Sequence, residues 1–295
     1  MIIVHLWFRT CVVFALLLIG FAGCKDEEDT HKFIRLSGYE QSNPSIVYLP
    51  STISQLSGIV YYPKDESIFC IDDNVGMLYK FPLYKKKILQ QWPFSSQIDF
   101  EELVLNDSTF YALKSNGDVT GFSFRNDSAI IDTFSSGNNI KVREFEAMVF
   151  DTARNQLLLI CKDCEDDAKN TTSVWGLDFA NKTLSDSPIF IIQGNQIEKL
   201  FGKKLSKFKP SSAAVHPVTG YFYYVSAIND ILLVTDRDGV VMEATALDKI
   251  LFKQPEGLSF MPDGTMLISN EFADMGTATI LLYPYNKNSK TTKKL

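Results

Sequence analysis

The sequence is an acidic chain of 295 residues, with 35 Asp and Glu against 29 Lys and Arg and a formal net charge of −6 at pH 7. A chain of this length buries a substantial core. The acidic balance argues against nucleic acid as a partner, because no basic stripe is present to neutralise phosphates.

Residues 1–23 are predicted to be a signal peptide. Arg9 precedes an apolar run from Cys11 to Ile19, which is too short to span a bilayer comfortably and is followed by small residues. The ending Ala22-Gly23-Cys24 resembles the lipobox of bacterial lipoproteins, although Phe21 stands where Leu is usual. This resemblance implies that Cys24 is acylated and anchors the protein in outer-membrane lipid. An ordinary cleaved signal with an incidental cysteine is the alternative.

Residues 24–42 are expected to form an acidic, flexible tether. The run Lys25-Asp26-Glu27-Glu28-Asp29 is too charged to bury. Cys24 followed by Lys, Asp and Glu also resembles the surface-export signal of lipoproteins in one Gram-negative phylum. The resemblance implies a location on the outer face of the outer membrane, with the periplasmic face as the second choice.

A short phrase then returns five times in the same register. Its second position is Ser57, Glu101, Glu146, Ser211 and Glu256, so the intervals are 44, 45, 65 and 45 residues. A period near 45 with several short apolar runs per unit is typical of a β-propeller with one four-stranded blade per repeat. We therefore predict an all-β fold, a propeller of five four-stranded blades over residues 43–286.

Four details complete the prediction. The fifth repeat lacks a fourth strand, and the segment Ser45–Leu49 is suited to fill that edge and close the ring. The 20 extra residues before the fourth repeat have helical spacing at positions 197, 200, 201 and 205. Cys161 and Cys164 are expected to form a local disulfide or to be two buried thiols, because no second CxxC or nearby His completes a zinc site. Residues 287–295 are predicted to be a basic tail.

Several segments resemble the SdiA-regulated family of periplasmic and surface propellers. The resemblance covers roughly residues 45–285 and is carried by the repeated strand starts, by Ser226–Gly239, by Gln254–Phe260 and by Ile268–Glu271. Ser57 and Ser211 depart from it, since an acidic residue could stand at either position. The resemblance implies a fold and a location more than an activity.

The candidate site lies on the propeller axis. Equivalent positions of the first strands form a ring in a propeller, which would bring together Ser57, Glu101, Glu146, Ser211 and Glu256. Asp73 and Glu271 follow second strands and should gather at the same end. Converging carboxylates favour a cation, and oxygen donors without clustered His or Cys favour Ca²⁺ or Mg²⁺. We predict Ca²⁺ held by Glu101, Glu146 and Glu256. The alternative is a water-filled channel that the acids merely face, or acids that accept hydrogen bonds from backbone amides at the strand starts.

Two function classes remain open. The first is a lipid-anchored envelope protein that binds a glycan, a peptide or a protein partner at this end of the ring. The second is a metal-dependent hydrolase resembling the lactonase or phytase-like propellers, with Asp73 or Glu271 as the base. His216 is the single histidine within the repeats and is interpreted as structural, and no nucleophile elbow or phosphate-binding glycine loop is present. We favour binding.

Overall fold

The protein is described by a computed structural model. The structure describes residues 34–39, 43–53, 55–72, 74–85, 90–125, 128–134, 142–271 and 277–289. The chain divides into two units, Met1–Lys32 and Phe33–Leu295. The first unit, with the predicted signal peptide and Cys24, lies outside the described residues, as does Asp73. The rest of this section concerns the second unit.

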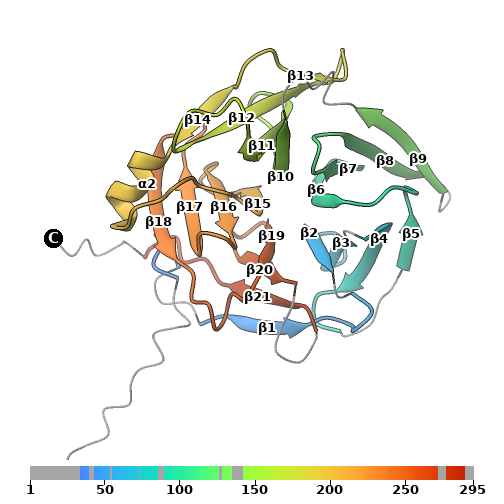
Figure 1. The fold of residues 1–295 in the computed structure, drawn as a ribbon. Coiled ribbons are helices and arrows are strands. Elements are labelled where there is room, and N and C mark those ends of the chain that lie inside the picture. The colour runs from blue at the N-terminus through green and yellow to red at the C-terminus, as the bar shows by residue number, and fades with distance from the viewer. Residues whose placement is uncertain are drawn as a thin grey trace, which may run out of the picture. The chain divides into compact units, whose positions relative to one another are not determined.

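Short antiparallel strands build five sheets, which are arranged as the blades of a ring (Figure 1). Blade 1 contains β2 (Leu56–Tyr62), β3 (Ser67–Asp72), β4 (Val75–Pro82) and β5 (Gln90–Pro93). Blade 2 contains β6 (Phe100–Asn106), β7 (Thr109–Lys114), β8 (Val119–Arg125) and β9 (Ser128–Phe134). Blade 4 contains β15 (Ser212–Val215), β16 (Phe222–Ser226), β17 (Ile231–Thr235) and β18 (Val241–Ala246). The expected five-bladed propeller is confirmed.

Blade 5 is closed by the N-terminal strand, as predicted. It contains β19 (Pro255–Phe260), β20 (Met266–Asn270) and β21 (Thr279–Tyr283), and its outer strand is β1 (Ser45–Tyr48). β1 pairs antiparallel with β21, with Ser45 opposite Leu282 and Tyr48 opposite Thr279. The last blade thus joins both ends of the folded chain, and β21 is not left as an unpaired edge.

Blade 3 differs from the expected single outer strand. It contains β10 (Arg143–Asp151), β11 (Gln156–Cys164) and β12 (Thr171–Asp178). The outer position is divided between β13 (Thr183–Leu184) and β14 (Phe190–Gln193), which pair with opposite halves of β12. β14 leads directly into helix α2 (Gly194–Phe201).

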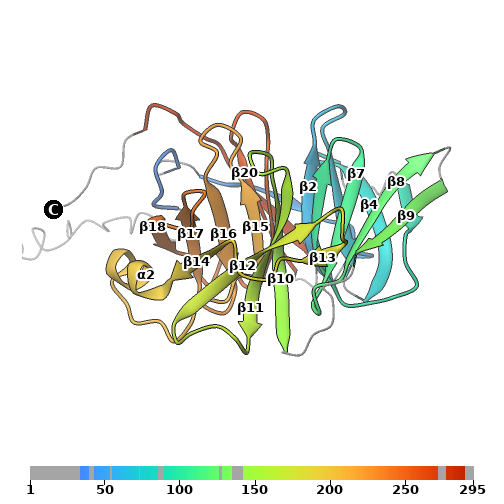
Figure 2. The same cartoon turned by 90° about the horizontal axis from the view of Figure 1, so that it is seen from above.

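Helix α2 is shorter than the apolar spacing indicated. It ends at Gly202, whose φ of 75° is left-handed, so Leu205 lies past the helix. Ile197 is buried between blades 3 and 4, whereas Leu200 is exposed. The helix packs at the periphery of the ring near β18 (Figures 1 and 2). Its apolar face is narrow, so it covers only the edge of the blade.

The hydrophobic core is divided into five clusters, one between each pair of neighbouring blades. Each sheet has two apolar faces, and each face packs on the next blade. The innermost strands β2, β6, β10, β15 and β19 contact one another in a closed ring, and the strands run from one face of the ring to the other (Figure 2). This arrangement fixes an axis onto which one strand of every blade faces.

The range 24–42 was expected to be a tether, but its described part is packed. Ile34, Leu36 and Tyr39 are fully buried in the cluster between blades 4 and 5, and the Tyr39 hydroxyl donates to the Gly264 carbonyl at 2.6 Å. Burial of three apolar side chains within six residues stabilises the packing of this segment onto the ring. The folded unit therefore includes residues before 43.

Among the described residues, no helix is long and apolar enough to cross a membrane.

Candidate functional site

β-Bulges place the repeated glutamates at the axis. In blades 2, 3 and 5, the pairing of the first strand with the second skips one residue, and the skipped residues are Glu101, Glu146 and Glu256. In blade 1 the skipped residue is Gly58. A bulge residue is unpaired in the ladder and its side chain is redirected. The repeated phrase therefore marks a β-bulge near the start of the inner strand in blades 1, 2, 3 and 5, whereas β15 of blade 4 pairs with β16 without a register shift.

Carboxylates from non-neighbouring blades come together there. Glu256 of blade 5 is largely buried and lies within electrostatic reach of Glu271 and of Glu101 from blade 2. Burial, followed by these two like charges, raises the pKa of Glu256 to about 8, while Gln254 and Lys162 act in the opposite direction. We call Glu101, Glu146, Glu256 and Glu271 the acidic end of the channel.

Lys162 is a member of this site that the sequence did not reveal. Its ammonium group is ion-paired with Glu146 and lies 3.2 Å from Glu144, and it also acts on Glu256. Its side chain is only 19% exposed. Lys162 stands between the two cysteines of the CxxC sequence, where the spacing of the cysteines gives no signal for the lysine. The acidic end thus already contains one cation supplied by the chain.

Cys161 and Cys164 form a disulfide, which resolves the two alternatives left open above. The bond joins two residues of β11 and closes a small ring that carries Lys162 and Asp163. Lys162 points to the glutamates, whereas Asp163 accepts from Lys209 at 2.7 Å. The disulfide therefore holds two opposite charges in defined directions at the end of β11, because a ring closed over two intervening residues has few conformations.

Ser57 and Ser211 occupy the predicted positions but are buried. The Ser211 hydroxyl accepts the amide of Ala227 at 3.0 Å, so it holds a loop of its own blade. Glu271 accepts from the Gln254 side chain, and its amide donates to the Gln254 carbonyl at 3.0 Å. The structure therefore brings the glutamates together, and it gives Ser211 a local contact instead.

A second missed residue, Glu102, crosses the channel. This carboxylate is 1% exposed and accepts from Ser212 Oγ at 2.5 Å, the Ala213 amide at 3.1 Å and the Leu103 amide at 3.0 Å. Ser212 Oγ in turn accepts the Leu258 amide at 3.0 Å. We call this network the Glu102 bridge; it joins blades 2, 4 and 5. Burial raises the pKa of Glu102 well above its ordinary value, and the three donated hydrogen bonds oppose that rise.

The Glu102 bridge has a physical reason and a sequence signal. The inner strand of each blade is an edge strand of its sheet, so the backbone edge that faces the axis has no ladder partner. Buried amides on that edge need other acceptors. The third phrase position is otherwise small: Gly58, Ala147, Ser212 and Gly257. A Cβ on Gly58 would lie 2.8 Å from Glu102 Oε1. A large residue, Glu102, at a position where the other repeats have small residues was the signal in the sequence for this bridge.

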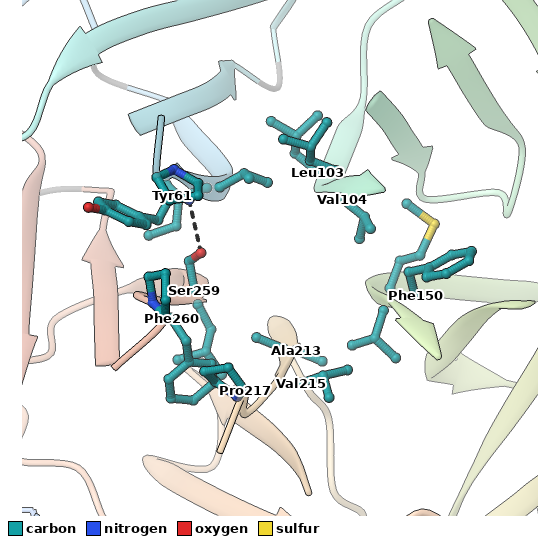
Figure 3. A pocket seen from close by; sticks show the side chains of 18 residues that line it. Tyr61, Leu103, Val104, Phe150, Ala213, Val215, Pro217, Ser259 and Phe260 are labelled. Atoms are coloured by element: carbon teal, nitrogen blue, oxygen red, sulfur yellow. Dashed lines mark hydrogen bonds between the residues drawn. The ribbon is translucent and has the colours of Figure 1, made fainter. Parts of the chain in front are cut away.

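Beyond the Glu102 bridge the channel is apolar. A cavity of about 360 Å³ lies among the later residues of all five inner strands (Figure 3). Its lining includes Leu103, Ala213 and Leu258, whose amides belong to the Glu102 bridge. We call it the central cavity. The bridge thus separates two chemically different ends of one channel.

His216 is buried and structural, as interpreted. Its Nδ1 accepts the amides of Val218 and Thr219, both at 3.1 Å, which places the proton of the neutral ring on Nε2. Nε2 then donates to the Tyr39 hydroxyl at 3.0 Å. Burial lowers the pKa of His216 to about 4. With both ring nitrogens engaged, His216 is not available as a general base.

Comparisons with known proteins give the fold class. No family model and no curated protein matches the sequence. Among solved structures, the glutaminyl cyclase of Myxococcus xanthus is similar with a TM-score of 0.56 at 12% identity, over 82% of this chain and 96% of that chain. A Trichoderma reesei carbohydrate-active enzyme of family AA12 gives 0.47 at 9% identity, over 85% and 97%. The five sheets define the chain as a β-propeller, and the likeness to the glutaminyl cyclase extends to this fold alone.

Proposed function

We propose that this β-propeller is a lipid-anchored cell-envelope protein of the SdiA-regulated kind, which binds a ligand at its acidic end. Two observations support the envelope location. The ending Ala22-Gly23-Cys24 resembles a lipobox. The disulfide between Cys161 and Cys164 belongs to an oxidising compartment, since structural disulfides are rare in the cytoplasm.

The observation that carries the binding proposal is the convergence of Glu256, Glu101 and Glu271 from different strand ends. Three carboxylates at one place disfavour their own ionised forms, and a bound cation relieves that repulsion. Oxygen donors suit Ca²⁺. In this proposal Glu101, Glu256 and Glu271 hold the cation, and Glu146 joins them only when Lys162 releases it.

The surroundings of the acidic end favour a polypeptide ligand over a glycan. Four strongly exposed aliphatic side chains stand in loops on the face where the inner strands begin: Ile98 (58%), Val142 (76%), Ile228 (60%) and Ile250 (73%). Exposed apolar groups around a charged centre are typical of protein interaction sites. A partner that presents apolar side chains around a basic or metal-bridged centre would complement this face.

The hydrolase alternative stays a prediction. His216 does not serve as its base, because both ring nitrogens are engaged.

Calcium titration tests the cation site. The melting temperature of the purified, chelator-treated protein should rise with Ca²⁺, by about 5 °C or more at a concentration 100 times the Kd. The double variant Glu101→Gln/Glu256→Gln should lose this rise, and Asp107→Asn, on an exposed hairpin turn, should keep it. If neither Ca²⁺ nor Mg²⁺ changes the melting temperature and elemental analysis finds no metal, the cation is removed from the proposal.

The anchor is tested in the same series. Cys24→Ala should move the protein from the membrane fraction to the soluble fraction, with mass spectrometry of the N-terminal peptide showing the loss of acyl chains. Protease added to intact cells separates the surface from the periplasmic face.

A further inference from the structure

The central cavity is a second recess of the molecule, independent of the acidic end. It occupies about 360 Å³ on the axis and receives residues from β2, β6, β10, β15 and β19. No charged side chain belongs to its lining among the described residues. Cavities of this size and apolar character are those in which proteins hold small molecules.

The ring geometry keeps this space open. The five inner strands contact one another in a closed circle, so the backbone cannot collapse inward without separating the blades from their packed clusters. Around the open centre, Val104, Ala213, Val215 and Ser259 present short side chains (Figure 3). Short side chains on a ring that cannot contract leave unfilled volume. Protein interiors are otherwise packed to crystal-like density.

The polar features of the central cavity are few. The Ser259 hydroxyl accepts the Tyr61 amide at 3.0 Å (Figure 3), and its own proton has no acceptor among the contacts of the described residues. One hydroxyl donor in an apolar recess selects for a ligand with one acceptor. A charged ligand is disfavoured, since burial of an unpaired charge is costly.

We propose that the central cavity binds one small, uncharged and mainly apolar molecule with a single hydrogen-bond acceptor directed at Ser259. An apolar cavity of about 150 Å³ holds benzene in a protein interior, so a cavity of about 360 Å³ accommodates a fused or linked pair of rings, or an aliphatic chain of similar volume. The Glu102 bridge closes the end nearest the acidic site, so the ligand enters from the opposite face of the ring.

Fluorescence of N-phenyl-1-naphthylamine, a neutral apolar dye, tests the proposal. The protein should bind about one equivalent saturably. Val104→Phe and Val215→Phe, each filling the central cavity, should weaken binding at least about tenfold. Val240→Phe, a matched substitution at an exposed position outside the cavity, should bind as the unsubstituted protein does. Loss in the two filling variants alone supports the site.

Absence of saturable binding, or undiminished binding in both filling variants with native melting temperatures, overturns the proposal. A measurement on the unsubstituted protein covers the case in which the filling variants do not fold. Crystals soaked in 1-bromonaphthalene should show bromine anomalous signal among the five inner strands. Bromine found only elsewhere, or nowhere, also overturns it. The calcium titration is unaffected by either result, so the two sites succeed or fail separately.

Discussion

The pKa of Glu256 reflects its burial and the other carboxylates of the acidic end. Folding raises its pKa from an ordinary 4.5 to about 8 through burial and the charges of Glu271 and Glu101. The folded chain therefore holds a proton that the unfolded chain releases at neutral pH. The stability due to that proton is complete below about pH 4.5 and is lost as the pH rises toward 8.

Glu256→Gln should remove this dependence, because glutamine stays neutral. In chelator-containing buffer we expect the variant to be more stable than the unsubstituted protein at pH 9 by about 1–3 kcal/mol, a value reduced for the partial exposure of the site. The difference should shrink toward pH 5. Urea unfolding across this range measures it, with Asp107→Asn as control. If the free energy of unfolding changes with pH equally in all three proteins, Glu256 does not carry the proton.

At the scale of elements, the segment that closes the ring places β1 beside β21. Leu49 directly follows β1; it is 3% exposed in the cluster between blades 5 and 1, and its amide donates to the Ala278 carbonyl at 2.9 Å. Ile46, in β1 itself, is 41% exposed. The same short segment therefore offers a buried and an exposed aliphatic side chain for comparison.

Leu49→Ala should lower the free energy of unfolding by about 2–4 kcal/mol, since it leaves a cavity beneath the closing strand. Ile46→Ala should lower it by less than about 1 kcal/mol. Chemical denaturation followed by tryptophan fluorescence gives both values. Similar small losses in the two variants would mean that closure contributes little to the stability of the ring.

The element boundaries were predicted unevenly, for physical reasons. Turn residues and apolar alternation mark each blade, so the five repeats and the strand supplied by Ser45–Tyr48 could be predicted. The divided outer edge of blade 3 and the end of α2 at Gly202 could not. Outer strands and short helices pack on one side only, and their limits depend on tertiary neighbours.

At the scale of the whole molecule, the Glu102 bridge ties non-neighbouring blades across the axis. Glu102→Ala should leave Ser212 Oγ and the amides of Leu103 and Ala213 without their acceptor. The expected loss in the free energy of unfolding is about 3 kcal/mol or more, because buried donors without partners are costly.

Two variants make this expectation specific. Glu102→Gln keeps one acceptor oxygen and should lose about 1–2 kcal/mol. Glu101→Ala, at the neighbouring bulge, should change stability by less than about 1 kcal/mol. Guanidinium unfolding curves compare all three. If Glu101→Ala and Glu102→Ala are equally destabilising, the bridge is not the contact that joins the blades.

The sequence alone determined the all-β class, the number of blades, the closing strand and the register that repeats a glutamate at 101, 146 and 256, because these follow from periodicity and local turn chemistry. Only the tertiary structure decided what those glutamates meet. Lys162 between Glu144 and Glu146, Glu102 across the axis and the apolar central cavity all depend on which side chains from distant blades share the same few ångströms. Spacing along a chain sets which strand a residue occupies, whereas closure of the ring sets its neighbours.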